Sequence, residues 1–354
     1  MKKKLRLVKF FLLLHIKEHW LSKLNVRPLV AELFMTENCN LRCVSCTCWH
    51  EFTSNELSTC EWKNIIEQLI DLDFVKLNFT GGEPLLRKDL LELIEYASKG
   101  KLEIHLNTNA ILLTSEKLQQ LLDAGVRSFN ISIDAPNSAT HNLIRGRDNA
   151  FETTIKHLRH LSTQKKQYGL KIRVNFTVMK DNYTYLPQMA ELAKDLDVRL
   201  YLNLASDQTF LFRDNRVTQL MQVDLPDLKE SLKQMVELKR KYPKYLPSFV
   251  DFEYIEKHFQ DIIQRETPCA ESQLKLMIHS QGQIGGCWGH DPKFNVREKS
   301  VNEILGSSEY VESHAAFFKK QCVGCGSNYS LNLRWRASSW IRNFMWKNNL
   351  LFFN

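Results

Sequence analysis

Between residues 30 and 204, short runs rich in β-branched, aromatic and aliphatic residues alternate with longer amphipathic stretches. The runs have the length of strands, and the stretches have the apolar period of helices. We therefore predict successive β/α units, with strands at 30–35, 74–80, 102–108, 128–134, 171–179 and 198–204. Such alternation is typical of an α/β fold whose parallel sheet is covered by helices, and this number of units predicts a partial (β/α)6 TIM-type barrel.

The regular alternation ends after residue 204. Residues 226–241 have a helical pattern, and further along two short β-rich runs, 274–279 and 283–288, flank a Ser-Gln-Gly turn sequence. A glycine-containing turn between two such runs predicts a hairpin, so we expect a small C-terminal α+β domain around it. No apolar run approaches the roughly 18 residues that a membrane span requires, so we expect a chain that does not cross a bilayer.

The chain of 354 residues is long enough for a catalytic domain and a smaller appendage. Pattern and charge divide it into a basic amphipathic N-terminal helix (1–29), a partial barrel (30–240), a C-terminal unit (241–333) and a basic aromatic segment (334–354). Hydrophobic residues make up 44% of the chain and charged residues 25%. These fractions favour a well-packed globular core over extensive disorder.

Cysteine is frequent, with nine residues in the chain. The amino terminus has a basic start but no small-residue cleavage site after its apolar stretch, so we expect a cytoplasmic protein. In a reducing compartment, cysteines at short spacings are better interpreted as metal or cluster ligands than as disulfides. Cys48 and Cys60 match no ligand spacing, and we interpret them as small buried hydrophobic residues.

Three cysteines, Cys39, Cys43 and Cys46, directly follow the first predicted strand. In β/α barrels, active sites lie at the carboxyl ends of the strands, so this loop lies where chemistry is expected. Three thiolates can bind three irons of a 4Fe-4S cluster and leave the fourth iron without a protein ligand. From the spacing alone, a zinc site or unrelated core cysteines remain the alternative.

Further motifs stand at the ends of the next strands, and with the cysteines they resemble the radical S-adenosylmethionine (radical SAM) superfamily over about residues 30–205. The motifs are Gly81-Gly82-Glu83-Pro84, Thr108-Asn109, Ser132-Ile133-Asp134 and His141-x₃-Arg145-Gly146. The resemblance implies a 4Fe-4S cluster that binds S-adenosylmethionine at its open iron. It also implies reductive cleavage of S-adenosylmethionine to a 5′-deoxyadenosyl radical, which abstracts a hydrogen atom from the substrate.

The same resemblance implies cofactor-binding roles for Gly81, Gly82, Glu83, Pro84, Asn109, Ser132, Asp134 and Arg145. Glycines allow close backbone approach to a ligand, and the Glu83 carboxylate can accept hydrogen bonds from a bound amino group. Ser132 and Asp134 are assigned to the ribose side, with helix-capping residues at a strand end as the alternative. In the family an aromatic residue usually precedes the third cysteine; here that residue is Ser45, and Trp49 is the candidate replacement.

A second group of cysteines, Cys269, Cys287, Cys322 and Cys325, lies in the C-terminal unit. Four thiolates satisfy all four irons of a second 4Fe-4S cluster, or alternatively one tetrahedral zinc ion. Together with Gly282, their spacing resembles the shortened twitch form of the SPASM extension, because no cysteine follows Cys325. That resemblance implies one auxiliary cluster, with electron transfer as its role.

Positive charge is concentrated at the two ends of the chain. The net charge is +8, of which residues 1–29 supply +7 and residues 329–354 supply +4. Apolar residues recur at helical spacing in the first segment, at Leu5, Val8, Leu12, Ile16 and Trp20, and three of the seven tryptophans lie in the last twenty residues. Basic helices with interfacial aromatic residues are typical of binding at a membrane surface. Packing of both segments on the catalytic domain, with the cations facing water, is the alternative.

These features favour a radical SAM enzyme that oxidises or modifies a small or lipid-linked substrate of the sugar or cyclitol type, in the cytoplasm or peripherally at the inner membrane surface. A peptide maturase is the enzymatic alternative, and only 38 residues precede Cys39, few for a peptide-recognition domain. A zinc-binding scaffold without catalysis is the alternative of another class. We expect a reducing electron donor such as flavodoxin or ferredoxin as a partner, whereas no RNA-binding module indicates nucleic acid.

Overall fold

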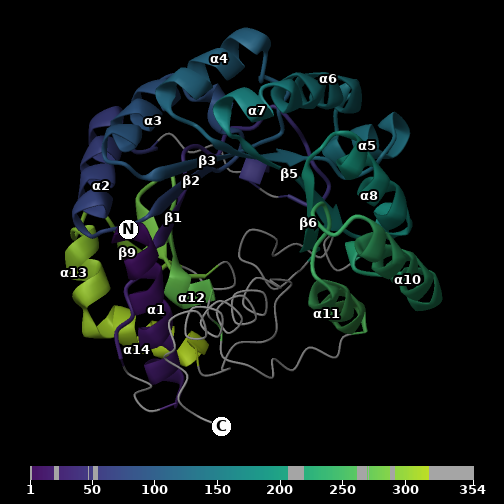
Figure 1. The fold of residues 1–354 in the computed structure, drawn as a ribbon. Helices are drawn as coiled ribbons and strands as arrows, with labels where there is room; N and C mark the ends of the chain where they lie inside the picture. Colours follow the sequence, from purple (N-terminus) through teal and green to yellow (C-terminus); the bar gives the residue numbers. More distant parts are fainter. Residues whose placement is uncertain are drawn as a thin grey trace.

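The computed structural model describes residues 2–19, 24–46, 48–50, 55–205, 219–260, 269, 271–287 and 292–318. Within these residues, a continuous nine-stranded sheet has the order β6-β5-β4-β3-β2-β1-β7-β8-β9. Strands β1 to β6 are parallel neighbours in chain order. They curve into an open barrel with helices on its outer side (Figure 1). The predicted α/β fold with a partial (β/α)6 barrel is therefore confirmed.

The barrel strands lie close to their predicted positions, and helices or short 3₁₀ turns connect them. The strands are β1 (Val30–Phe34), β2 (Lys76–Thr80), β3 (Glu103–Thr108), β4 (Ser128–Ser132), β5 (Lys171–Val178) and β6 (Arg199–Leu204). The helices are α2 (Thr59–Asp71), α3 (Leu90–Lys99), α4 (Ser115–Ala124), α5 (Ser138–Arg145), α6 (Ala150–Thr163), α7 (Lys165–Tyr168) and α8 (Leu186–Asp195). The 3₁₀ turns are η1 (Cys48–His50), η2 (Pro84–Leu86) and η3 (Tyr183–Tyr185). After β6 come α10 (Leu225–Lys241) and α11 (Phe249–Phe259).

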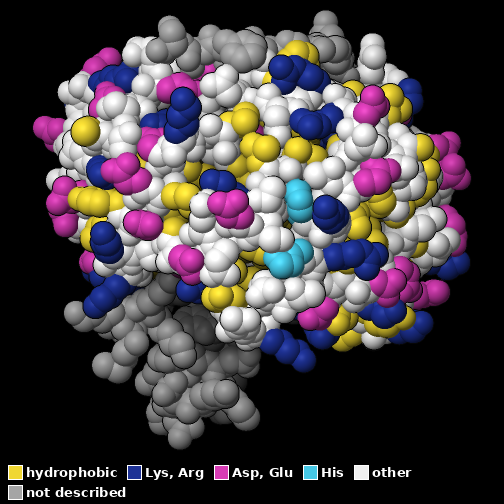
Figure 2. Space-filling view, turned by 90° about the horizontal axis from the view of Figure 1, so that it is seen from above, with side chains coloured by type: hydrophobic (Ala, Val, Ile, Leu, Met, Phe, Trp, Pro, Cys, Tyr) yellow, Lys and Arg dark blue, Asp and Glu magenta, His cyan; other side chains and the backbone are white. Residues whose placement is uncertain are grey.

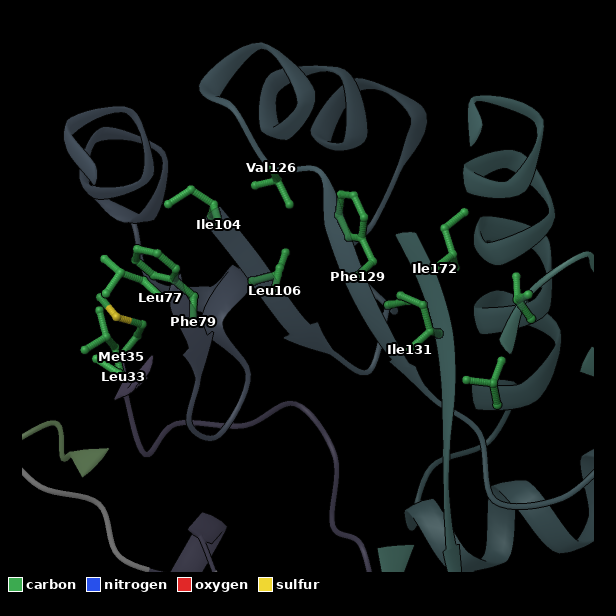
Figure 3. Close-up of a cluster of buried hydrophobic side chains, with 14 of the residues drawn as sticks. Leu33, Met35, Leu77, Phe79, Ile104, Leu106, Val126, Phe129, Ile131 and Ile172 are labelled. Atoms are coloured by element: carbon green, nitrogen blue, oxygen red, sulfur yellow. The ribbon is translucent and has the colours of Figure 1, made fainter. Parts of the chain in front are cut away.

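Side chains of the barrel strands alternate between two faces with different chemistry. On the outer face, apolar residues such as Leu77, Ile104 and Phe129 pack against the helices in one hydrophobic core (Figure 3). Successive strand residues point to opposite faces, so the positions between these apolar residues face the barrel interior. One asparagine from each of β2 to β6 occupies such a position: Asn78, Asn107, Asn130, Asn175 and Asn203. We call these five residues the asparagine wall.

The C-terminal unit continues the barrel sheet. Its strands are β7 (Lys275–Ile278), β8 (Gln283–Gly285) and β9 (Phe294–Asn295), and its helices are α12 (Glu271–Leu274), α13 (Val301–Gly306) and α14 (Ser308–Phe318). The predicted hairpin is confirmed, because β7 and β8 are antiparallel around Gly282, whose φ of 91° favours glycine. In addition, β7 pairs in parallel with β1. The edge of the barrel next to β1 is thereby covered by a strand more than 240 residues away in the chain.

The N-terminal segment forms α1 (Lys2–His19), which packs on the fold. Phe10 and Leu14 are buried against Val26, Val75 and Leu274. Leu12, which the predicted apolar face included, is 50% exposed. The apolar face of α1 that packs on the fold is therefore a different one.

Charges of both signs are interspersed with apolar patches on the face seen from above (Figure 2). Among the residues that the structure describes, no helix is long and apolar enough to span a membrane. The basic aromatic segment 334–354 lies outside the described residues, as do Cys322 and Cys325.

Candidate active site

The cysteine loop, residues 36–46, leaves the carboxyl end of β1 and lies against the loop that follows β2. Gly82 N donates to Thr36 O at 2.7 Å. A Cβ atom on Gly81 would lie 2.4 Å from the same Thr36 oxygen, and one on Gly82 would lie 2.2 Å from Asn38 O. Both positions require glycine because the two backbones are in direct contact there. These glycines therefore shape the cysteine loop itself.

Glu83 is fully buried immediately after the two glycines. Its Oε1 accepts from Thr108 Oγ1 at 2.7 Å and from Leu85 N at 3.1 Å, and its Oε2 accepts from Asn109 N at 2.8 Å. Burial raises the pKa of Glu83 to about 7, although these hydrogen bonds oppose the shift. Pro84 opens the η2 turn, so the carboxylate is held where β2 and β3 end.

Asn109 joins the end of β3 to the cysteine loop. Its Nδ2 donates to Asn40 Oδ1 at 2.7 Å, and its Oδ1 accepts from Ile111 N at 3.0 Å. Thr154 Oγ1 on α6 donates to Asn109 O at 2.9 Å. Asn40 was not among the predicted site residues, although its place beside Cys39 within the motif is a usable signal.

The three thiols of the cysteine loop belong to one apolar cluster, which also contains Leu41. Burial raises the pKa of Cys39 to about 11 and also raises the pKa of Cys43. A hydrogen bond with the Cys48 thiol lowers the pKa of Cys46 to about 7. The side chains of Cys39 and Cys46 pack against the same apolar cluster that contains Cys43.

Two residues of η1, Cys48 and Trp49, contact the cysteine loop. Trp49 Nε1 donates to Cys43 O at 3.4 Å, and the Arg42 guanidinium lies 5.2 Å from the centroid of the Trp49 ring. The prediction that Cys48 is only a buried hydrophobic residue misses its thiol contact with Cys46. The same prediction is wrong for Cys60, which lies exposed on α2. An amphipathic helix places one side in water, and Cys60 occupies that side.

Asp134 and Arg145 form a buried ion pair next to Cys43. Arg145 Nη2 lies 2.7 Å from Asp134 Oδ2, and the two side chains are 12% and 2% exposed. Burial opposes the charge of Arg145, yet the Asp134 carboxylate and the Cys43 sulfur raise its pKa above the ordinary value. Ser132 ends β4 and faces the barrel interior beside Asn175, its register partner on β5.

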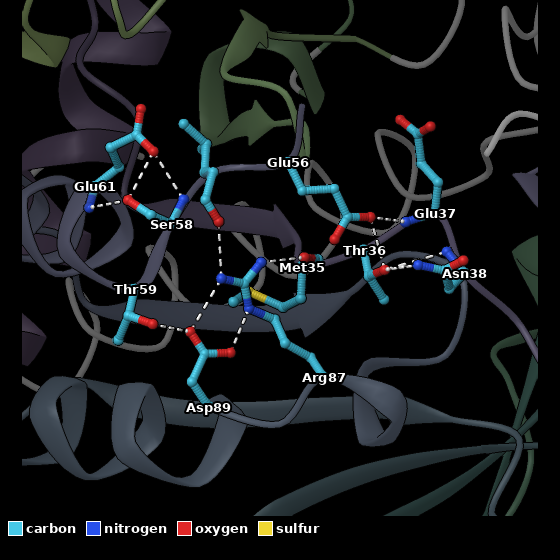
Figure 4. Close-up of polar contacts among 11 residues, drawn as sticks. Met35, Thr36, Glu37, Asn38, Glu56, Ser58, Thr59, Glu61, Arg87 and Asp89 are labelled. Atoms are coloured by element: carbon cyan, nitrogen blue, oxygen red, sulfur yellow. Dashed lines mark hydrogen bonds and ion pairs between the residues drawn. The ribbon is translucent and has the colours of Figure 1, made fainter. Parts of the chain in front are cut away.

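A second polar network anchors the segment that flanks the cysteine loop (Figure 4). The Arg87 guanidinium donates to Met35 O at 2.9 Å and to Leu57 O at 2.8 Å, and it pairs with Asp89 at 2.6 Å. Glu56 accepts from Thr36 Oγ1 at 2.7 Å. The start of the cysteine loop is thus tied to the segment preceding α2.

The C-terminal cysteines are partly described. Cys269 is buried just before α12, and Cys287 follows β8. Gln273 Nε2 on α12 donates to His314 O on α14 at 3.2 Å, and a Cβ on Gly286 would lie 1.8 Å from His314 Nε2. The His314 ring therefore lies against the backbone immediately before Cys287, while Cys322 and Cys325 lie outside the described residues.

The residues of the first site suit a cluster with three protein ligands. Three thiols pack at one apolar cluster, and a guanidinium beside Cys43 can balance thiolate charge. In the described part of the chain, no three or more His, Cys, Asp or Glu residues are grouped tightly enough to hold a single metal ion.

Comparison with known families agrees with this geometry. Residues 33–193 match the model of the Radical SAM superfamily. Residues 33–193 thus form a radical SAM domain. Members of the superfamily are enzymes that use a 4Fe-4S cluster and S-adenosylmethionine, so the predicted class and these cofactors are confirmed.

Relatives of this radical SAM enzyme act on different substrates. The AdoMet-dependent heme synthase of Methanosarcina barkeri is 27% identical over 324 residues, which cover 82% of this chain and 89% of the relative. The PqqA peptide cyclase of Bradyrhizobium diazoefficiens is 34% identical over 172 residues, which cover 48% of this chain and 44% of the relative. The match thus spans less than half the length of the peptide cyclase.

Solved structures share the fold. Streptococcus suis SuiB bound to its precursor peptide SuiA matches with a TM-score of 0.66 at 18% identity, covering 82% of this chain and 67% of SuiB. The enzyme anSMEcpe with bound AdoMet matches with a TM-score of 0.61 at 16% identity, covering 82% of this chain and 83% of that one. At these identities the likeness concerns the fold alone.

Proposed function

We propose that this radical SAM enzyme modifies a peptide. The observation that carries the proposal is the asparagine wall, which lines the barrel interior below the cysteine loop with primary amides. An amide side chain both donates and accepts hydrogen bonds, as a peptide backbone does. The similarity to the PqqA peptide cyclase supports the same substrate class.

In this proposal, Cys39, Cys43 and Cys46 hold the catalytic cluster. When bound, the cluster and S-adenosylmethionine supply reductive carbon–sulfur cleavage and a carbon-centred radical. Glu83 lies at the strand ends beside the cysteine loop, where its carboxylate can accept hydrogen bonds from the amino group of S-adenosylmethionine. Asn109 keeps the strand end and the loop together.

Cys269, Cys287, Cys322 and Cys325 are proposed to hold an auxiliary 4Fe-4S cluster. Four thiolates leave no iron open to substrate, so electron transfer is the chemistry that this site suits. The burial of Cys269 and the packing of His314 beside Cys287 bring parts of α12, β8 and α14 together in support of such a site.

A small-molecule substrate is the second candidate. It is supported by the AdoMet-dependent heme synthase, whose match covers 82% of this chain. The sugar or cyclitol interpretation has weaker support. The lipid-linked version depends on membrane binding by the two basic ends of the chain, and one of these ends, α1, packs on the fold instead.

Anaerobic reconstitution followed by product analysis tests these proposals. We expect a protein with iron and sulfide that forms 5′-deoxyadenosine from S-adenosylmethionine when reduced by dithionite or flavodoxin. A pool of candidate peptides should stimulate that formation and change in mass, whereas an iron porphyrin should not. Stimulation by the porphyrin alone would favour the second candidate, and a colourless zinc protein would refute both.

A further inference from the structure

The backbone on both sides of Cys43 is held by the carboxyl end of α5. Val44 N donates to Ile144 O at 2.9 Å, and Arg42 N donates to Arg145 O at 3.1 Å. These carbonyls belong to the last turn of a helix, where they have no partner within the helix. The cysteine loop therefore uses the free end of α5 as its support.

Gly146 makes this approach feasible. Its φ is 61°, and a Cβ there would lie 2.3 Å from Arg42 O. Glycine adopts this left-handed conformation without steric cost and adds no atom at the contact. The helix consequently ends directly against the cysteine loop, and the last helical side chain, Arg145, reaches back over that loop.

The Arg145 guanidinium reaches the sulfur of Cys43. Its Nη1 donates to Cys43 Sγ at 3.7 Å, while its Nη2 contacts Asp134 Oδ2 at 2.7 Å. The Nε atom is buried and has no hydrogen-bond partner in the described part of the chain. Asp134 thus orients Nη2 of the guanidinium, while Nη1 faces the Cys43 thiol.

Asp134 is itself fixed from several elements. Its Oδ1 accepts from Thr177 N at 2.9 Å, its N donates to His141 Nδ1 at 3.2 Å, and its O accepts from Asn182 Nδ2 at 3.0 Å. With Oδ2 on Arg145, both carboxylate oxygens have protein partners. This arrangement fixes the carboxylate in the position from which it orients Arg145.

We propose that Arg145, oriented by Asp134, is a positioning residue that donates a hydrogen bond to the Cys43 ligand sulfur and raises the reduction potential of the catalytic cluster. Hydrogen bonds to the sulfurs and nearby charge are among the determinants of cluster potential. A donor with a positive charge stabilises the reduced cluster, which carries one more electron, more than the oxidised cluster. The inference rests on the proposed role of Cys43 as a ligand.

The test is a redox titration of the reconstituted cluster, followed by EPR, in matched variants. Arg145→Gln should lower the midpoint potential, and Arg145→Lys, which keeps the charge, should lower it less. Arg147→Gln is the control, because Arg147 Nη1 donates at 3.2 Å to the backbone carbonyl of Asn40 in the same loop and not to a sulfur. The control should keep the wild-type potential.

A double variant controls for loss of folding caused by an unpaired buried charge. Arg145→Gln leaves the Asp134 charge buried without its partner, which is strongly unfavourable. Asp134→Asn/Arg145→Gln removes both charges and should load iron, with a potential lowered less than in Arg145→Gln, because the buried negative charge is removed together with the positive one. An unchanged potential in iron-loaded variants, or failure of all three Arg145 variants to load iron, would overturn the inference in favour of a role in S-adenosylmethionine binding or in packing.

Two further readouts separate this inference from the proposed function. If wild-type protein loads no iron or forms no 5′-deoxyadenosine, the proposed function fails. If wild-type protein does both and only the potential is insensitive to Arg145, the inference alone fails. Binding of S-adenosylmethionine, measured by calorimetry on the oxidised cluster, should be affected less than the potential; a large loss of affinity at constant potential contradicts the positioning role.

Discussion

The two cysteine sites of this chain are built in opposite ways. The first places three cysteines within residues 39–46, on a loop held by the segments that follow β2 and β3 and by the end of α5. The second spreads its proposed ligands from Cys269 to Cys325, and its described cysteines are separated by α12, β7 and β8. The first loop is held by hydrogen bonds to neighbouring segments, whereas the proposed ligands of the second site are far apart in the chain.

This difference has a physical consequence for metal binding. Where a metal joins segments that lack other contacts, its binding free energy contributes to folding. Where hydrogen bonds already hold the loop, metal binding requires little ordering of the backbone. We therefore expect the first site to depend on its thiols for chemistry and the second to depend on its metal for structure as well.

The largest expected effect comes from the first site. Cys43→Ala should abolish 5′-deoxyadenosine formation and the iron of the catalytic cluster, because one of three required ligands is removed. Circular dichroism should show an intact fold. Cys60→Ala, on the exposed side of α2, is the control and should keep full activity. Undiminished cleavage in Cys43→Ala would refute the ligand assignment.

At the second site, Cys322→Ala/Cys325→Ala should remove roughly half of the iron, as expected for one of two similar clusters. Some uncoupled cleavage of S-adenosylmethionine should survive, because the first loop is intact. Iron content and 5′-deoxyadenosine are measured on the same samples. An unchanged iron content would mean that the second site holds no cluster.

Removal of iron by a chelator should distinguish the two regions by hydrogen exchange. The amides of Arg42 and Val44 should stay protected, because they donate to the end of α5. The amides of α14 should exchange faster if the proposed auxiliary cluster contributes to holding that helix beside Cys287, in addition to the direct contact of His314. Equal loss of protection in both regions would remove the distinction between them.

Glu83 provides a pH test of the first site. Its pKa of about 7 means that the carboxylate becomes charged as the pH rises through neutrality. If it accepts hydrogen bonds from the amino group of S-adenosylmethionine, affinity should increase between pH 6 and pH 8, a window of about one unit on either side of that pKa. Glu83→Gln should weaken binding by about tenfold or more and flatten this pH dependence, while retaining most of the iron. Loss of iron would mean that Glu83 is structural.

The smallest expected effect concerns the contact between the two regions. Arg297, after β9, pairs with Glu61 on α2 at 2.6 Å, and both side chains are partly exposed. Arg297→Ala should therefore cost at most about 1 kcal/mol in a denaturant titration. The guanidinium lowers the pKa of Glu61 from its ordinary value of 4.5 to about 2. The stabilisation should be complete above pH 4.5 and disappear as the pH falls toward 2; a cost that persists at the acidic end would contradict this origin.

The order of the barrel strands, their approximate bounds and the cysteine loop could all be predicted from the sequence. These features depend on local information, namely apolar period, turn residues and the spacing of a few cysteines. The same information allowed the family motifs to be recognised at the strand ends. The hairpin of β7 and β8 was predictable for the same reason, because its two strands are neighbours in the chain.

Only the tertiary structure decided the contacts between distant segments. Pairing of β7 with β1, burial of Phe10 and Leu14 on α1, and contact of Arg145 with the Cys43 sulfur all join residues that no local pattern relates. Such contacts depend on which surfaces become adjacent when the sheet closes and the helices pack. Sequence alone therefore specified the chemistry at the strand ends, whereas packing decided which of those groups face one another.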